Sequence, residues 1–183
     1  MNRLVGVIAA FCGLPGVAHA DSEQALSLGL GYATFSAPGQ PVDNMPAPSL
    51  SPSVGWGLTG AYERAIGTDV SLRGELAGGM FFGGNTKDQS SRSYAVLGDL
   101  GVGFRFDILN WVPYAFAGLG AVASGGGPID RGTDFVLVVG GGLDKLLNRR
   151  QSIGLELRLA SFGGDLTVFT LGFRGTVRWA PLL

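Results

Sequence analysis

The feature that most constrains this fold is an alternation of period two, in which bulky apolar side chains take turns with small or polar ones. Side chains on a β-strand point to opposite faces in alternation, so the pattern predicts strands with one bulky apolar face. The chain also contains 32 glycines, and each would cost about 1 kcal/mol inside a helix. The alternation recurs in residues 25–35, 54–63, 70–82, 94–106, 112–122, 135–144, 153–160 and 169–179.

The connections between these segments differ in length on the two sides. Residues 36–53, 83–92, 123–133 and 162–165 connect one side, and all but the last are long. Tight links near residues 67–68, 108–110 and 148–151 connect the other. Segments of about ten residues suit tilted strands that cross a bilayer, and long loops opposite short turns are typical of outer-membrane barrels. We therefore expect an all-β fold, an eight-stranded antiparallel up-and-down transmembrane β-barrel.

The volume of the apolar faces decides between this barrel and a soluble sandwich or lipocalin-type barrel. In the soluble folds the eight bulky faces would share one interior, which is too much volume for an eight-stranded lumen. If these faces point to lipid, the lumen is lined by Gly, Ala, Ser, Thr and a few charges. We expect all eight bulky faces to point outward, including Val112, Tyr114, Phe116 and Val122 in the segment 112–122.

The N-terminus has the composition of a secretory signal peptide. A basic start and an apolar stretch end in an A-x-A cleavage site at residues 18–20. We expect residues 1–20 to be a cleaved signal peptide, residues 21–183 to form the barrel, and the mature chain to start at Asp21. Cleavage removes Cys12 and His19, the only cysteine and the only histidine. Thiol and imidazole chemistry would then be absent, so we expect no enzyme activity, no cofactor and no metal. A formal charge of −1 argues against a nucleic-acid partner.

Charged residues on the small-residue faces are the candidate site. We expect them to form a hydrogen-bonded network that fills the lumen, with a gated polar pathway as the alternative. If the termini are periplasmic, Glu63 and Asp144 also lie in the periplasmic half of the lumen or around its centre. The predicted network consists of Arg73, Glu75, Asp99, Arg105, Glu156, Arg158, Arg174 and Arg178.

The outer half of the lumen is lined mainly by small and apolar residues. It either forms a shallow apolar cup or is filled by these side chains. The larger residues of the predicted cup are Phe81, Leu97, Leu119, Val136, Val138 and Val168.

Several motifs resemble those of the small eight-stranded outer-membrane barrels of Gram-negative bacteria, the barrels like the OmpA transmembrane domain, OmpX and OmpW. The motifs are Leu-Gly-Leu-Gly-Tyr at 28–32, Gly-Val-Gly-Phe at 101–104 and the segments 113–120 and 155–159. The resemblance implies an outer-membrane location, with membrane lipid and the outer-membrane assembly machinery as partners. These motifs indicate architecture and not activity, and without catalytic chemistry we expect a structural or surface-interaction role, with surface ligands met through the longer loops. The alternative is a small porin-like channel, or a binder or transporter of small apolar molecules.

Overall fold

The computed structural model describes residues 23–38, 49–83, 92–106, 108, 110–126, 132–162 and 166–179. The expected signal peptide, residues 1–20, lies outside these ranges. No helix of the described residues is long and apolar enough to span a membrane. The strands are β1 (Gln24–Pro38), β2 (Ser49–Leu50), β3 (Val54–Ala65), β4 (Val70–Phe82), β5 (Arg92–Arg105), β6 (Trp111–Gly125), β7 (Gly132–Asn148), β8 (Gln151–Phe162) and β9 (Leu166–Trp179).

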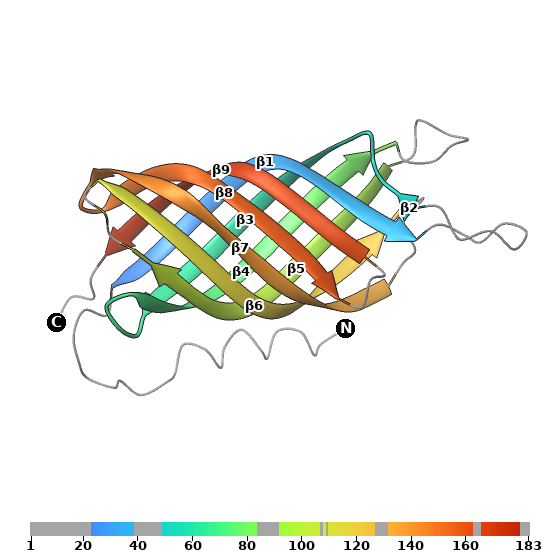
Figure 1. Ribbon diagram of the computed structural model, residues 1–183. Coiled ribbons are helices and arrows are strands. Elements are labelled where there is room, and N and C mark those ends of the chain that lie inside the picture. Colours follow the sequence, from blue (N-terminus) through green and yellow to red (C-terminus); the bar gives the residue numbers. More distant parts are fainter. Residues whose placement is uncertain are drawn as a thin grey trace, which may run out of the picture.

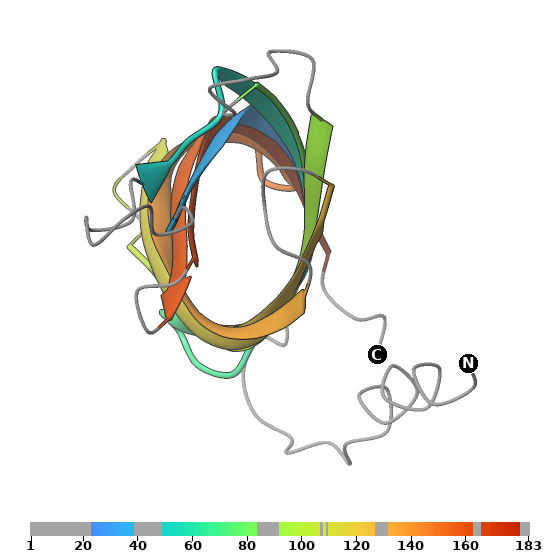
Figure 2. The same ribbon diagram turned by 90° about the vertical axis from the view of Figure 1, so that its right-hand side faces the viewer.

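Eight of these strands close into a barrel, as the sequence predicts. Each pairs antiparallel with the next in the order β1-β3-β4-β5-β6-β7-β8-β9, and β9 pairs back onto β1 from Gln24↔Trp179 to Ser36↔Thr167. Figure 1 shows the tilted strands from the side, and Figure 2 shows the closed ring. The two-residue strand β2 pairs only with the end of β1, at Ala37↔Leu50 and Pro38↔Ser49. The expected all-β eight-stranded barrel is confirmed.

Tight hairpins lie at one end of the barrel, which we name the turn end, together with the start of β1 and the end of β9 (Figure 1). The amide groups of Ile66 and Gly67 donate to the Val70 carbonyl between β3 and β4. Ile108 and Trp111 exchange two backbone hydrogen bonds of 3.0 Å between β5 and β6. Between β7 and β8 the Arg150 amide donates to Asn148 Oδ1 at 2.8 Å. The opposite end is the loop end.

The outer wall of the barrel is apolar. Leu28, Leu58, Leu76 and Phe173 point outward and are each more than 60% exposed. Exposed aromatic side chains stand near both rims. Those near the turn end are Tyr62, Phe104, Trp111 and Trp179, and those toward the loop end are Tyr32, Trp56, Tyr94 and Phe135. An outward apolar band between two aromatic girdles is the surface of a barrel that sits in a lipid bilayer.

Strand β6 has the opposite orientation to the one predicted from its sequence. Val112, Tyr114, Phe116 and Val122 point into the barrel and are at most 7% exposed, whereas the alternate positions, mostly alanine, face outward. The pairing of β5 with β6 fixes this, because Gly103 and Arg105 oppose Phe116 and Tyr114. The expectation that the bulkier face of each strand points to lipid is therefore wrong for β6 and correct for the other seven.

Candidate functional site

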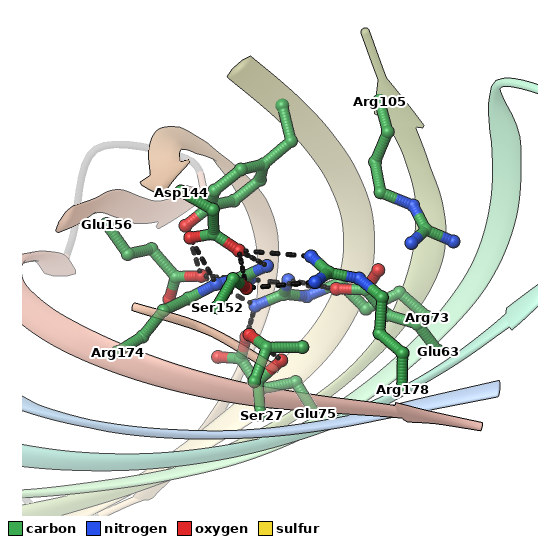
Figure 3. A network of polar contacts seen from close by, with 12 residues as sticks. Ser27, Glu63, Arg73, Glu75, Arg105, Asp144, Ser152, Glu156, Arg174 and Arg178 are labelled. Atoms are coloured by element: carbon green, nitrogen blue, oxygen red, sulfur yellow. Dashed lines mark hydrogen bonds and ion pairs between the residues drawn. The ribbon is translucent and has the colours of Figure 1, made fainter. Parts of the chain in front are cut away.

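The turn half and the centre of the lumen hold a network of buried charges, shown in Figure 3. Arg73 on β4 donates to Glu63 Oε1 on β3 at 2.9 Å and to Glu156 Oε2 on β8 at 3.1 Å, and it also bonds Glu75 on its own strand. Arg158 on β8 lies 2.8 Å from both Glu75 Oε1 and Glu156 Oε1. Both guanidinium groups therefore reach across the lumen and join the opposite walls formed by β4 and β8.

Strand β9 supplies the other two arginines. Arg174 donates to Glu156 Oε2 at 3.0 Å and to Asp144 Oδ2 at 3.2 Å, with Asp144 located on β7. Arg178 donates to Ser152 Oγ at 3.0 Å and to Asp144 Oδ2 at 3.4 Å. No member of the network is more than 7% exposed. The charged network comprises Glu63, Arg73, Glu75, Asp144, Glu156, Arg158, Arg174 and Arg178.

The charges in this network balance, with four carboxylates against four guanidinium groups. Removing a charge from water is costly, and it becomes tolerable when the charge is paired and hydrogen-bonded. Each guanidinium group has a carboxylate oxygen within 3.4 Å, so all four cations are paired. Because the two kinds of charge are equal in number, the network is neutral without any added ion.

Two aromatic rings from β6 complete the network. The Arg73 guanidinium lies 3.9 Å from the centre of the Phe116 ring, and that of Arg174 lies 3.9 Å from the centre of the Tyr114 ring. The Tyr114 hydroxyl also donates to Glu156 Oε2 at 3.2 Å. These stacking contacts favour the inward orientation of β6, because desolvated cations gain from an aromatic face. Neither ring was predicted to face the lumen, because the bulk of a side chain alone served as the sign of the lipid face.

The structure brings six of the eight predicted charged residues together: Arg73, Glu75, Glu156, Arg158, Arg174 and Arg178. Two of their partners, Glu63 and Asp144, were placed in the same half of the lumen by strand parity and were not included in the predicted network.

Arg105 and Asp99 stand apart from the network. Arg105 is partly buried near the turn end, where it forms an ion pair with Glu23 at 3.4 Å, and Figure 3 shows it away from the other arginines. Asp99 is 6% exposed and forms no ion pair with another described residue. Its Oδ2 atom has no hydrogen-bond partner there either. Arg105 links β5 to the start of β1 outside the network, and Asp99 joins no other strand through an ion pair with a described residue.

The loop half of the lumen is filled by apolar side chains that we name the apolar plug: Phe35, Phe81, Val122, Val136 and Val138. Each is at most 2% exposed. The Phe35 and Phe81 rings meet edge to face with centroids 5.0 Å apart, and the valines belong to the same packed cluster. These side chains are as inaccessible to solvent as those of an ordinary protein core.

The predicted cup is largely occupied by its own lining. Phe81, Leu97, Val136 and Val138 are buried in the packed cluster, and Val168 is half-buried against it. Leu119 contradicts the prediction, because it is 55% exposed on the outer face of β6. Its displacement follows from the orientation of that strand, which places Gly118 and Gly120 rather than Leu119 inside.

A small cavity of about 30 Å³ remains beside the plug, lined by residues including Phe81, Leu97, Val168 and Arg158. A second cavity of about 10 Å³ lies beside Glu156 and Arg174. The larger one has room for about two water molecules, whereas pockets for drug-sized ligands measure roughly 300–1,000 Å³. Within the described part of the chain, no group of three or more His, Cys, Asp or Glu residues could hold a metal ion.

Comparisons with known proteins agree with this architecture. A family model described as outer membrane protein beta-barrel domain matches residues 5–175. Neisserial surface protein A is 16% identical, with a TM-score of 0.62, covering 85% of this chain and 97% of that one. Ail of Yersinia pestis, in complex with the heparin analogue sucrose octasulfate, is 17% identical, with a TM-score of 0.54, covering 87% and 100%.

The N-terminal β-barrel domain of Pseudomonas aeruginosa OprF is 15% identical, with a TM-score of 0.54, covering 87% of this chain and 98% of that one. At these identities the likeness to the three structures shows a common fold. No curated protein matches the sequence.

Proposed function

Since this chain belongs to the outer membrane protein beta-barrel domain family, we propose that it is a non-conducting, non-catalytic barrel of the outer membrane with a structural or surface-interaction role. Its wall anchors it in the bilayer, its lumen is closed, and its loop end faces outward. We infer that residues 1–20 direct export and are removed after Ala20.

The observation that carries this proposal is the double closure of the lumen. The charged network joins β3, β4, β7, β8 and β9 across the turn half and the centre. The apolar plug fills the loop half. A permeating ion would have to separate buried ion pairs and then pass through an apolar layer, and both steps are costly. A lumen built in this way supports the wall.

The chemistry of the lumen supports a non-catalytic role. Every carboxylate of the network already binds at least one arginine, so none is left as a base toward a substrate. The only histidine and the only cysteine of the chain, His19 and Cys12, precede the barrel. Arginine guanidinium groups stay protonated and therefore do not serve as bases.

The alternative role in transporting small apolar molecules loses its structural support. It needs a cup that is open to the outside and lined by Phe81, Leu97, Leu119 and Val138. Leu119 faces lipid, Val138 is fully buried, and the remaining cavity holds about two waters. We therefore do not propose transport.

The loop end of the barrel supports a surface-interaction role. The outer wall is taken up by lipid and the lumen by its own side chains, so the loop end is the part of the molecule that remains for contacts outside the cell. Ail, which has the same fold, holds a heparin analogue in its crystal structure. By analogy we propose surface ligands for this chain, met through the connections that follow β1, β4 and β6.

Conductance measurements in planar bilayers test the closed lumen. We expect the refolded chain to insert without steady current steps, because network and plug together leave no continuous aqueous path. An open porin in the same bilayers serves as the positive control for the assay. Reproducible steps of constant amplitude from the refolded chain would refute the proposal, since they require a water-filled pathway through the barrel.

A further inference from the structure

A cluster of cations lies at the turn end of the barrel, on the wall formed by β6, β7 and β8. Lys145 is exposed on the outward face of β7, and Arg149 and Arg150 are exposed in the turn between β7 and β8. None of the three forms an ion pair with another described residue. The network inside the barrel neutralises its own charges, so it does not compensate these cations.

The surroundings of Lys145 are those of a membrane interface. In the strand register Lys145 lies between Trp111 on β6 and Ile153 on β8. Trp111 is 48% exposed and Ile153 53% exposed, so both side chains face lipid. The Lys145 ammonium group lies 5.8 Å from the centre of the Trp111 ring. A lysine with an apolar stem beside an interfacial tryptophan places its charge at the level of the lipid headgroups.

The acidic residues of the same wall do not cancel this charge. On the described parts of β6, β7 and β8 the acidic residues near the turn end are Asp144 and Glu156, and both point inward and are buried. The remaining acid of these strands, Asp134, lies at the loop end of β7. Among the described residues at the turn end of β6, β7 and β8 and in the turn between β7 and β8, the cluster therefore presents three cations and no exposed carboxylate.

We propose that Trp111, Lys145, Arg149 and Arg150 form a docking surface for anionic phospholipid headgroups in the leaflet around the turn end. The phosphate would meet the three cations, and the acyl chains would lie along the apolar wall above Lys145. Charge complementarity selects this occupant, because a basic cluster beside a membrane attracts anionic lipid by about 1 kcal/mol per cation. The periplasmic side, to which the short turns conventionally belong, is where this leaflet lies.

Tryptophan fluorescence quenching by brominated lipid tests the proposal. The chain has three tryptophans, Trp56, Trp111 and Trp179. A W56F/W179F chain reports from Trp111 at the cluster, and a W111F/W179F chain reports from Trp56 at the loop end. Each is reconstituted into phosphatidylcholine vesicles that contain brominated phosphatidylglycerol or, at the same fraction, brominated phosphatidylcholine. The ratio of the two quenching efficiencies measures the local enrichment of the anionic lipid. Because both leaflets have the same composition, the direction of insertion does not matter.

We expect phosphatidylglycerol to be enriched about fivefold or more at Trp111, the factor that one cation supplies, and to show little enrichment at Trp56. The triple change K145Q/R149Q/R150Q should bring the ratio at Trp111 close to one. The matched control R64Q removes a cation near the same end from β3, a strand that does not neighbour β7, and should leave that ratio unchanged. Arg64 forms no ion pair with another described residue.

Repeating the quenching measurement at high salt tests the charge dependence without any substitution at the cluster. At 1 M NaCl the screening length falls to about 3 Å, so enrichment at Trp111 should be lost if it depends on charge. A ratio of one at Trp111 in low salt would overturn the proposal and leave the cluster to another occupant, such as an acidic protein segment. A ratio that persists in the triple variant or at high salt, or equal enrichment at Trp56, would overturn it as well.

Discussion

At the scale of single residues, Glu156 is the most connected carboxylate of the lumen. It binds Arg73, Arg158 and Arg174 at distances between 2.8 and 3.1 Å and accepts the Tyr114 hydroxyl at 3.2 Å. The side chain is nearly inaccessible to water, so no solvent is at hand to replace these contacts. Glu156 therefore links three of the four network arginines, each of which has one further carboxylate partner or more.

Replacing Glu156 by alanine should destabilise the barrel by about 3–5 kcal/mol, because buried guanidinium groups lose their shared counter-charge. Urea unfolding in lipid vesicles, followed by tryptophan fluorescence, measures the effect. Asp134→Ala is the matched control, since it removes an exposed acid and should change the free energy of unfolding by less than about 0.5 kcal/mol. An unchanged unfolding midpoint for Glu156→Ala would show that the network does not stabilise the barrel.

At the scale of elements, β6 is the one strand of the barrel whose orientation was predicted wrongly from the sequence. On the other seven strands the bulky residues are mainly aliphatic and the opposite residues are small or charged, so parity identified the lumen correctly. On β6, Tyr114 and Phe116 oppose Ala115 and Ala117, and bulk alone pointed the wrong way. The correct orientation depends on Arg73 and Arg174, which stack on these rings from strands distant in the sequence. Gly142 on β7 makes room, because a Cβ there would overlap the Tyr114 hydroxyl.

The sequence predicted which face of a strand each charged residue of the candidate site occupies, but not which residues lie opposite one another. Arg73, Glu75, Glu156, Arg158 and Arg174 were expected to meet because all lie on inward positions near mid-strand. The stagger of the strands was not available from the sequence, and it decides that Asp144 faces Arg174 and Arg178 whereas Asp99 faces Gly120. Parity gives the face of a residue, and only the register gives its partner.

Spin labels on β6 test its orientation. In a chain that starts at Asp21, which contains no native cysteine, Leu119→Cys should carry a label with high collision rates toward oxygen dissolved in lipid. Val122→Cys should carry a label with low rates, because this position is 1% exposed inside the barrel. Ala121→Cys, on the same face as Leu119, provides the matched comparison. High oxygen accessibility at position 122 combined with low accessibility at position 119 would contradict the orientation of β6 described above.

At the scale of the whole molecule, the barrel depends on the contact between its first and last strands. Gly31 on β1 lies opposite Gly172 on β9, and a Cβ on Gly31 would overlap the backbone of residues 171 and 172. Such an overlap with backbone cannot be relieved by a side-chain rotation. The close approach of β1 and β9 at this level therefore requires glycine.

Gly31→Ala should weaken closure by about 1–3 kcal/mol, the usual cost of overpacking. In unheated detergent gels a closed barrel runs as a compact band, and the temperature at which this band shifts should fall for Gly31→Ala. Gly78→Ala adds the same methyl group to the outer face of β4, where a Cβ meets nothing within 4 Å, and should behave like the unmodified chain. Equal shift temperatures for the two variants would contradict the close approach at the β1–β9 contact.

Because Arg174 and Arg178 stand on β9, the charges of the lumen balance only when this last strand is docked. Until β9 is in place, Glu63, Glu75, Asp144 and Glu156 face only Arg73 and Arg158, so the nascent interior carries two uncompensated negative charges. Asp144 has the greatest deficit, because both of its arginine partners come from β9. The unfinished sheet must keep its inner surface hydrated until the last strand arrives. Docking of β9 then supplies the missing hydrogen bonds of the wall and the missing cations together. Expulsion of water and sealing of the barrel are thereby coupled into one cooperative step.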